Sequence, residues 1–316
     1  MEAASTAAAA GGRPGAPSLR AARRRYGEDL IKAFLVLAAL ISLLTTTGIV
    51  YALAKETIVF LGDVGIGDFL FGTKWTPLFK PASFGVLPLV VGTFATTAIA
   101  LVVAIPLGLG GAIYLSEYAR PRVRKTIKPV LELLAGVPTI VFGYFALTFF
   151  TPEILRSFLN MDVAIFNALA AGIIIGFLII PIVASISEDA MRAVPQALRE
   201  GAFGLGGSKL QVTLRVVFPA ALSGIVASVV LAMSRAVGET MVVLIAGGQQ
   251  PQWGVDVQKS METLTAFIAG TAKGDAATGS IAYKTIFAVG MTLFVITLVM
   301  NLISIRFVRK YRQVYE

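Results

Sequence analysis

Apolar residues in this 316-residue chain are gathered into six long runs that alternate with shorter polar segments. A transmembrane helix needs about 20 apolar residues to cross a hydrocarbon core of about 30 Å. Each run is long enough, so the pattern predicts six transmembrane helices at roughly 30–54, 86–116, 130–150, 164–187, 219–247 and 281–305. The predicted fold class is an all-α polytopic membrane protein whose membrane domain covers residues 29–312.

Composition supports a membrane protein. Hydrophobic residues make up 56% of the chain, the mean hydropathy is +0.81 and 14% of residues are charged, whereas soluble domains carry about 25% charged residues. The first residues differ from the rest, because they are rich in alanine, glycine, proline and arginine and show no apolar periodicity. We expect residues 1–28 to form a disordered basic tail and residues 313–316 a short C-terminal tail.

The distribution of positive charge predicts which side the termini occupy. Six spans put both termini on one side, and 19 of the 27 lysines and arginines fall on that side. Cytosolic segments carry an excess of positive charge, so both termini are expected in the cytosol. The net charge of +9 does not indicate nucleic acid, because the arginines at 23–25 adjoin the first apolar run, where anionic lipid headgroups are the nearer counterions.

Two residue types are missing from the chain, which has no cysteine and no histidine. Their absence excludes disulfides and thiolate metal sites, and it removes the commonest metal ligand and the usual general base. We therefore predict no catalytic residue and no metal site, although a carboxylate-based site stays open. The glycine cluster at 204–209 has the wrong spacing for a phosphate-binding loop, so ATP hydrolysis is expected on another chain.

A polar segment with spaced glycines, residues 188–218, separates the fourth and fifth apolar runs. An ordinary turn between two spans is the simpler interpretation. Its spacing closely resembles the coupling loop of bacterial ABC-importer permeases, in which Glu-Ala-Ala, three residues, glycine and nine residues precede Ile-x-Leu-Pro. The residues that match this pattern or stand at its positions are Glu200, Gly201, Ala202, Gly206 and Pro219. The departures are mild and lie at Gly201, Val216 and Phe218. The resemblance implies that an ATPase subunit grips this segment.

The fifth predicted span contains two charged residues, Arg235 near its middle and Glu239 one turn further on, so both are expected on one helix face. Each charge costs about 2.5 to 3.5 kcal/mol on insertion scales, which makes an ionisable residue in a membrane a functional candidate. The alternative is a self-neutralising pair that only fixes helix packing.

Three spans contain a proline away from their first residues, at Pro106, Pro138 and Pro181. We expect the helices to be interrupted there, because broken helices at membrane depth line cavities in many transporters. Close packing between helices is an equally good explanation for the glycines near Pro106.

Longer segments resemble the permeases of the bacterial phosphate-specific ABC importer. They are the run from Ile180 through Pro219 and the sequence Ser-Arg-Ala-Val-Gly-Glu-Thr-Met at 234–241. The segments at 72–77, 84–93 and 135–143 resemble its C subunit in particular. The resemblance covers roughly residues 28–312.

This resemblance implies a type I ABC-importer permease fold in the bacterial cytoplasmic membrane. It implies a heterodimer with a paralogous permease subunit, two ATPase subunits that bind ATP and Mg, and an external phosphate-binding protein that delivers inorganic phosphate. Arg235 is then a transient phosphate ligand, and Glu239 holds Arg235 between cycles so that phosphate is released. The open alternatives are the paralogous A-type subunit, a permease for another oxyanion, a passive anion channel and a signalling scaffold.

Overall fold

The computed structural model describes residues 26–274 and 276–311. These residues form helices, and apart from one isolated bridge between Trp75 and Phe84 no β-structure occurs among them. The longer helices are α1 (Tyr26–Val64), α3 (Leu87–Ile113), α4 (Pro121–Ala135), α6 (Ala168–Arg192), α10 (Leu222–Val237) and α12 (Ile281–Tyr311). The shorter ones are α2 (Ile66–Phe71), α5 (Thr139–Phe145), α7 (Gln196–Gly204), α8 (Lys209–Val212), α9 (Phe218–Ala220) and α11 (Leu264–Thr271). The π-helical segments are η1 (Tyr114–Tyr118), η2 (Ala146–Phe158), η3 (Thr213–Val217) and η4 (Val243–Gly247).

The chain divides into two compact units, residues 1–49 and residues 50–316. In the first unit, the described part of α1 exposes nearly all of its largely apolar side chains. Such a helix suits lipid on every side. The second unit contains the packed bundle and every site discussed below.

Four described helices are long and apolar enough to cross a membrane alone, namely α1, α3 with η1, α6 and α12. Two bent pairs raise the number to six: α4 with α5 and η2, bent by 86°, and Lys209–Ala220 with α10, bent by 70°. The all-α polytopic fold class is thus confirmed. The third predicted span, 130–150, straddles the 86° bend, and the fifth, 219–247, runs beyond the end of α10.

The boundary of the predicted N-terminal tail needs a correction. Helix α1 begins at Tyr26, so residues 26–28 are helical rather than part of a disordered tail. Glu28 and Asp29 lie in its first turn, where carboxylates favour helix formation. Residues 1–25 and 313–316 of the predicted tails lie outside the described residues.

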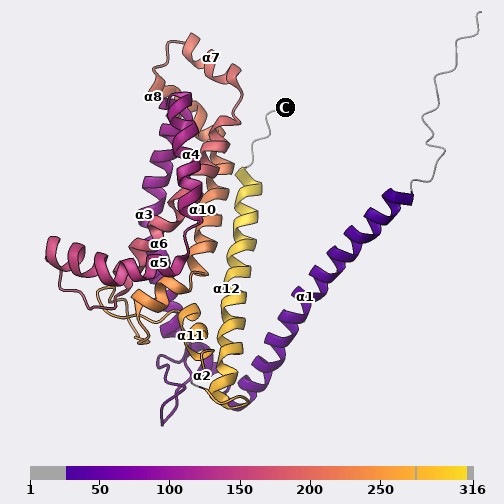
Figure 1. Ribbon diagram of the computed structural model, residues 1–316, viewed down its shortest axis with the longest axis vertical. Helices are drawn as coiled ribbons and strands as arrows, with labels where there is room; N and C mark the ends of the chain where they lie inside the picture. Colours follow the sequence, from indigo (N-terminus) through magenta and orange to yellow (C-terminus); the bar gives the residue numbers. More distant parts are fainter. Residues whose placement is uncertain (1–25, 275, 312–316) are drawn as a thin grey trace, which may run out of the picture. The chain divides into compact units, whose positions relative to one another are not determined.

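Helices α3 and α6 pack closely against each other along the bundle (Figure 1). A Cβ atom at Gly108 would lie 2.7 Å from Cβ of Val183, and one at Gly172 would lie 2.7 Å from Cβ of Ile99. Lipid provides little hydrophobic driving force between helices, so close contact through small residues stabilises their association. Packing therefore explains these two glycines.

The prolines fall into two groups. Pro106 and Pro181 lie inside the continuous helices α3 and α6, so the interruptions predicted at these two positions are wrong. Membrane helices tolerate proline where neighbouring helices and local adjustment satisfy the freed backbone groups. Pro138 differs, because α4 ends at Ala135 and α5 starts directly after this proline. Val137 precedes it, and the residue before a proline disfavours helical geometry.

The two ends of the bundle differ. Helices α7 and α8 lie at one end, and α2 and α11 lie at the other (Figure 1). At the α2–α11 end, Phe60, Phe69, Trp75 and Phe267 form an aromatic cluster in which the Trp75 and Phe267 rings meet edge to face at 4.9 Å. The Nε1 atom of Trp75 is buried and has no hydrogen-bond partner among the described residues.

Glu262 shares a cavity of about 220 Å³ with Trp75 at this end. It lies in the connection before α11, outside the candidate spans, and is 7% exposed. Burial raises the pKa of the Glu262 carboxyl to about 8 from an ordinary value of 4.5. An ionised carboxylate loses its hydration here, so the neutral acid is favoured.

A methyl group at Gly108 should destabilise the bundle. Gly108→Ala forces α3 away from Val183 and should reduce the free energy of unfolding by about 1 to 3 kcal/mol. Gly110→Ala is the matched control, because a Cβ atom there meets nothing within 4 Å. Thermal unfolding of the detergent-solubilised protein measures both variants. Equal stability of the two would contradict the packing of α3 on α6.

Stability should fall as the pH rises from about 4.5 to 8. In this window the folded protein keeps Glu262 protonated while the unfolded chain ionises it, so protonation favours the folded state less at higher pH. Glu262→Gln mimics the neutral acid and should raise the thermal midpoint at pH 8 relative to the unaltered protein, but not at pH 5. The exposed Glu153→Gln is the control. A parallel shift at both pH values would contradict this assignment.

Candidate functional site

The chain between α6 and α10 folds into short helices at one end of the bundle. Helix α7 carries Glu200, Gly201 and Ala202, and Pro219 lies in α9. Glu200 and Gly201 are exposed, whereas Ala202 is partly buried and packs on the cluster formed by the ends of α6 and α10. The residues singled out in the predicted coupling loop thus lie on one exposed helix and on the segment that anchors it.

Gly206 makes the turn between α7 and α8. Its φ of +83° is left-handed, a conformation that glycine adopts without the strain of a Cβ atom. The following Gly207 N–H donates to the Ala202 carbonyl at 3.1 Å, and Ser208 with Gln211 forms a capping box that starts α8. The glycine-rich sequence is therefore a helix end followed directly by a helix start.

Large apolar side chains are exposed on this segment, which is unusual for residues at the polar end of a bundle. Leu205 is 91% exposed. The others are Leu198, Phe203 and Leu210. A cavity of about 370 Å³ lies beside them, lined in part by Ala202, Gly206 and Val212. Several large exposed apolar groups on one short segment are typical of an interaction surface, so this segment suits a protein partner.

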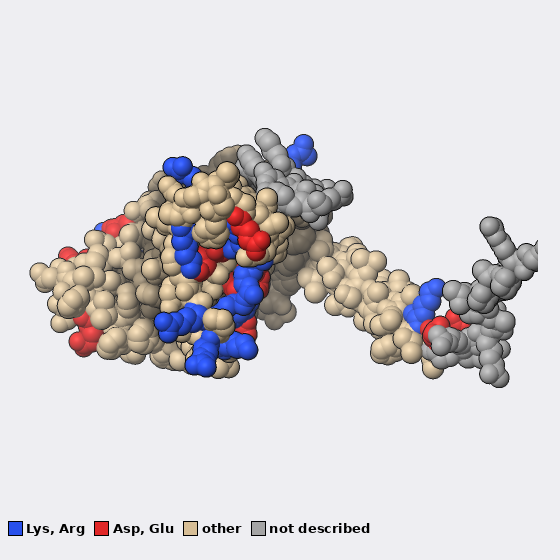
Figure 2. Space-filling view, turned by 90° about the horizontal axis from the view of Figure 1, so that it is seen from above, with Lys and Arg blue, Asp and Glu red and all other residues tan. Residues whose placement is uncertain are grey.

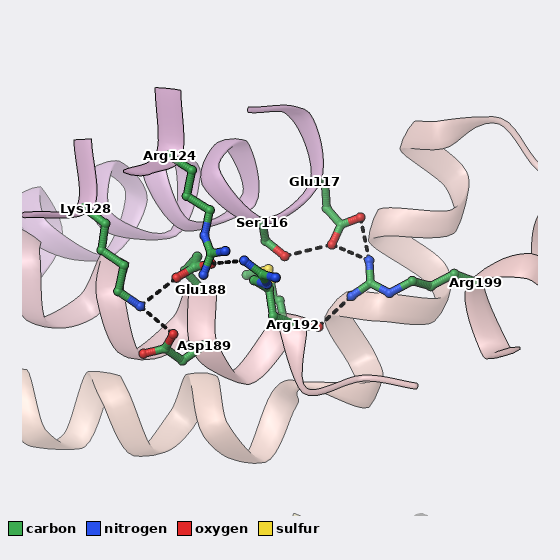
Figure 3. Close-up of polar contacts among 9 residues, drawn as sticks. Ser116, Glu117, Arg124, Lys128, Glu188, Asp189, Arg192 and Arg199 are labelled. Atoms are coloured by element: carbon green, nitrogen blue, oxygen red, sulfur yellow. Dashed lines mark hydrogen bonds and ion pairs between the residues drawn. The ribbon is translucent and has the colours of Figure 1, made fainter. Parts of the chain in front are cut away.

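Arg199 fastens α7 to the rest of the bundle (Figure 3). Its Nη1 donates to both carboxylate oxygens of Glu117 in η1, at 2.6 and 2.7 Å, and its Nη2 donates to the Met191 carbonyl of α6 at 2.7 Å. The Arg199 and Glu117 side chains are 12% and 9% exposed. Sequence reasoning missed this pair, because no local pattern links positions 82 residues apart.

A second ion cluster joins α4 to α6 near the same end (Figure 3). The fully buried Glu188 lies 2.7 Å from Arg124 Nε and 3.0 Å from Lys128 Nζ, and Lys128 also donates to Asp189 at 2.5 Å. Sequence reasoning missed this cluster too. A signal existed, because Glu188 and Asp189 directly extend the apolar run of α6 and a buried carboxylate there needs a basic partner.

Arg235 and Glu239 form an ion pair, with 2.8 Å between Arg235 Nη1 and Glu239 Oε2. The two side chains differ strongly in exposure, at 40% for Arg235 and 2% for Glu239. The pair therefore consists of a partly exposed guanidinium group and the buried carboxylate that positions it.

The two residues do not share a continuous helix, which corrects the prediction. Helix α10 ends at Val237, and Glu239 follows Gly238 in the turn before the next helical segment. Glu239 Oε1 accepts hydrogen bonds from the backbone N–H groups of Met241 and Val242 at 3.1 and 3.4 Å. A carboxylate that satisfies N–H groups at a helix start favours such a break.

The helical segment that follows Glu239, at 241–247, contacts other helices, α11 and α5 among them. Thr265 of α11 donates to the Glu239 carbonyl at 2.6 Å. On the other side α5, which follows Pro138, packs so closely that a Cβ atom at Gly143 would lie 3.1 Å from the Met241 carbonyl oxygen. The helices that follow the bend after α4 and the break after α10 are thus in contact, whereas α7 forms a separate site at the end of the bundle.

Comparison with known proteins identifies the family. Residues 104–313 match the family described as binding-protein-dependent transport system inner membrane component. The chain is 33% identical over 276 residues to the probable ABC transporter permease protein YqgH of Bacillus subtilis, covering 84% of this chain and 88% of that protein. It is 32% identical to the phosphate transport system permease protein PstC of Mesorhizobium japonicum, covering 89% and 91% of the two chains.

Solved structures agree on the fold. A bacterial alginate ABC transporter in complex with its alginate-bound periplasmic protein superposes with a TM-score of 0.62 at 16% identity, covering 89% of this chain and 96% of that one. The MetNI methionine ABC transporter superposes with a TM-score of 0.53 at 18% identity, covering 72% and 95%. The protein therefore has the fold of an ABC-importer permease, and it belongs to the family of binding-protein-dependent transport system inner membrane components.

Proposed function

We propose that this protein is a membrane subunit of an ATP-driven importer of inorganic phosphate, in which Arg235 contacts the anion during passage. The observation that carries the proposal is the half-exposed Arg235 guanidinium, held by a buried Glu239 beside a helix break. The relatives that are named phosphate transport permeases support the choice of substrate.

Arg235 suits a phosphate ligand because guanidinium groups pair with phosphate oxygens through several N–H donors. The bond from Arg235 to Glu239 uses one η nitrogen, and the Arg235 side chain is 40% exposed, so further N–H donors are available to an anion. Glu239 itself is fixed by two backbone N–H groups. Its role is to position Arg235 and to compete with phosphate, which keeps binding weak enough for release.

The α7 end faces the cytosol in this proposal, together with both chain termini. Two ATPase subunits bind and hydrolyse ATP with Mg, so this chain is not itself an enzyme. One ATPase docks on α7, and the other docks on the corresponding helix of the second permease subunit. In this chain Leu205 and Phe203 make the contact. Gly201 and Gly206 leave room for it. Arg199 transmits the movement of α7 to η1 and α6.

A paralogous permease completes the pathway as the second half of a heterodimer. The exposed apolar side chains of α5, such as Val141 and Tyr144, suit contact with that subunit. An extracytoplasmic phosphate-binding protein docks at the α2–α11 end, where Phe79 is 71% exposed. The complex lies in the bacterial cytoplasmic membrane. The solved alginate ABC transporter, which is in complex with a periplasmic protein, supports the docking of such a protein.

Leu205→Asp should weaken the docking of the ATPase subunits by about tenfold or more, because it puts a charge into an apolar contact. Co-purification of the ATPase and phosphate-stimulated ATP hydrolysis measure the effect. Val255→Asp is the control for co-purification, because Val255 is also exposed, at 72%, but lies in the connection between η4 and α11, away from α7. Normal ATPase association and uptake in Leu205→Asp would refute the docking surface.

Arg235→Gln should lower phosphate uptake by more than about tenfold while the complex still assembles, because it removes the charge-assisted bonds to the anion. The exposed Arg306→Gln is the control. Uptake is measured in vesicles that contain both permeases, the ATPase subunits, ATP and the binding protein.

The double variant Arg235→Gln/Glu239→Gln separates a ligand from a structural pair. A phosphate ligand predicts an assembled but inactive complex, because the double variant still lacks Arg235. A purely structural pair predicts that each single variant fails in assembly, since one buried charge loses its partner, and that the double variant recovers. Recovery of uptake at matched abundance would refute the role of Arg235.

A further inference from the structure

A positively charged cavity lies at the α7 end, apart from Arg235. Figure 2 looks onto this end and shows lysine and arginine side chains gathered there, with a few acidic ones among them. The cavity has a volume of about 330 Å³. Its lining residues include Ser116, Arg124, Arg192, Gln196 and Arg199. All charged side chains in this lining are arginines, so the cavity presents only positive charge among the described residues.

The three arginines come from three different helices. Arg124 belongs to α4, Arg192 is the last residue of α6, and Arg199 belongs to α7. These are the helices whose relative positions the ion pairs at this end determine (Figure 3). A ligand in the cavity would therefore lie among side chains from all three helices.

The acidic residues nearby do not fully neutralise the positive charge of these side chains. Glu117 pairs with Arg199 through both carboxylate oxygens, and its Oε1 also accepts a hydrogen bond from the Ser116 hydroxyl at 2.8 Å. Glu188, in contrast, is shared by Arg124 at 2.7 Å, Lys128 at 3.0 Å and Arg192 at 4.0 Å. The third carboxylate, Asp189, is taken by Lys128. Four cations thus share three carboxylates, and Arg192 keeps the longest contact and a side chain that is 47% exposed.

Hydrogen bonding at Arg124 is incomplete as well. Arg124 Nε and Glu188 Oε1 are close enough for an ion pair, but both are buried atoms without a hydrogen-bond partner of proper geometry. Guanidinium groups with unused N–H donors, from more than one helix and around a cavity with surplus positive charge, are suited to an oxyanion.

We propose that this cavity binds a phosphate group, with Arg192 and Arg124 as its principal ligands. The volume is of the size that small ligands occupy. The amide of Gln196 and the guanidinium of Arg199 lie in the same lining and supply further donors. The chemistry fits either free inorganic phosphate or the phosphodiester headgroup of an anionic lipid.

Occupancy has a consequence for transport that rests on the proposed function. A bound phosphate group neutralises the surplus charge and links α4, α6 and α7 through their arginines. Helix α7 then resists the displacement by which ATPase subunits drive the cycle. Free phosphate that accumulates in the cytosol therefore slows its own import at this site.

Binding is tested on the whole importer complex, without ATP or binding protein, by equilibrium dialysis with labelled inorganic phosphate. All variants carry Arg235→Gln, which removes the proposed pathway ligand. Arg192→Gln should weaken the remaining phosphate binding about tenfold or more, since it removes charge-assisted bonds. Arg122→Gln is the matched control, because Arg122 is exposed on α4 and absent from the lining. Equal affinity in the two variants would overturn free phosphate as the ligand.

The lipid source is tested in nanodiscs of phosphatidylcholine alone or with phosphatidylglycerol. Retention of phosphatidylglycerol that Arg192→Gln reduces and Arg122→Gln does not would assign the cavity to a lipid headgroup. If Arg192→Gln and Arg122→Gln bind phosphate equally and also retain phosphatidylglycerol equally, the proposed site is refuted. Loss of ATPase association in Arg192→Gln, with no change in either ligand, overturns it in favour of a protein contact.

Transport measurements separate this inference from the proposed function. In vesicles with Arg235 intact, excess phosphate on the ATPase side should slow uptake several-fold, and Arg192→Gln but not Arg122→Gln should relieve the inhibition. Active uptake without an Arg192-dependent inhibition refutes the regulatory role alone. Absence of phosphate uptake by the unaltered complex refutes the proposed function instead, while the dialysis result still decides whether the cavity binds phosphate.

Discussion

A carboxylate that leaves water must find positive charge or N–H donors, and this requirement fixes the interrupted parts of the bundle. Glu239 is held by Arg235 and by the backbone of the segment that follows α10. Glu188 joins α4 to α6, and Glu117 joins α7 to η1 through Arg199. Removing one partner from a largely buried pair such as Arg199 and Glu117 costs about 3 to 5 kcal/mol. The broken helices are therefore held by charge, whereas α3 and α6 are held by the fit of glycine against β-branched side chains.

These two kinds of contact suit different mechanical roles. The close packing of α3 on α6 leaves no room for sliding, so this pair acts as a rigid body. The bends at 136–138 and after α9 separate shorter helices that can rotate as units. Helix α6 also bonds to both α7 and α10, because its Met191 carbonyl accepts a hydrogen bond from Arg199 and its Ser187 hydroxyl bonds to Ser228 of α10 at 2.7 Å. A displacement of α7 thus meets a direct physical connection to the helix that carries Arg235.

The sequence allowed the helical fold and the order of the coupling residues to be predicted, because both depend on local patterns. Long apolar runs identify spans, and the spacing from Glu200 to Pro219 identifies the α7 segment. The break at Gly238 was not predicted, since an apolar run continues through it and only the bonds of Glu239 to Met241 and Val242 show that a new helix starts. The partners of Glu117 and Glu188 were missed because they come from distant segments.

The break after α10 bears directly on how Arg235 exchanges partners. A transport site must bind its anion and also release it. If Glu239 depended on Arg235 alone, their separation would leave a buried, unpaired carboxylate, and the arginine would stay with it. The backbone N–H groups of Met241 and Val242 keep Glu239 satisfied when Arg235 turns toward an anion, which lowers the cost of separation. When the anion leaves, Glu239 is still in place to take Arg235 back. The interruption of the helix is thus what makes the ion pair exchangeable, and a continuous helix, whose interior N–H groups are already bonded, would not provide these donors.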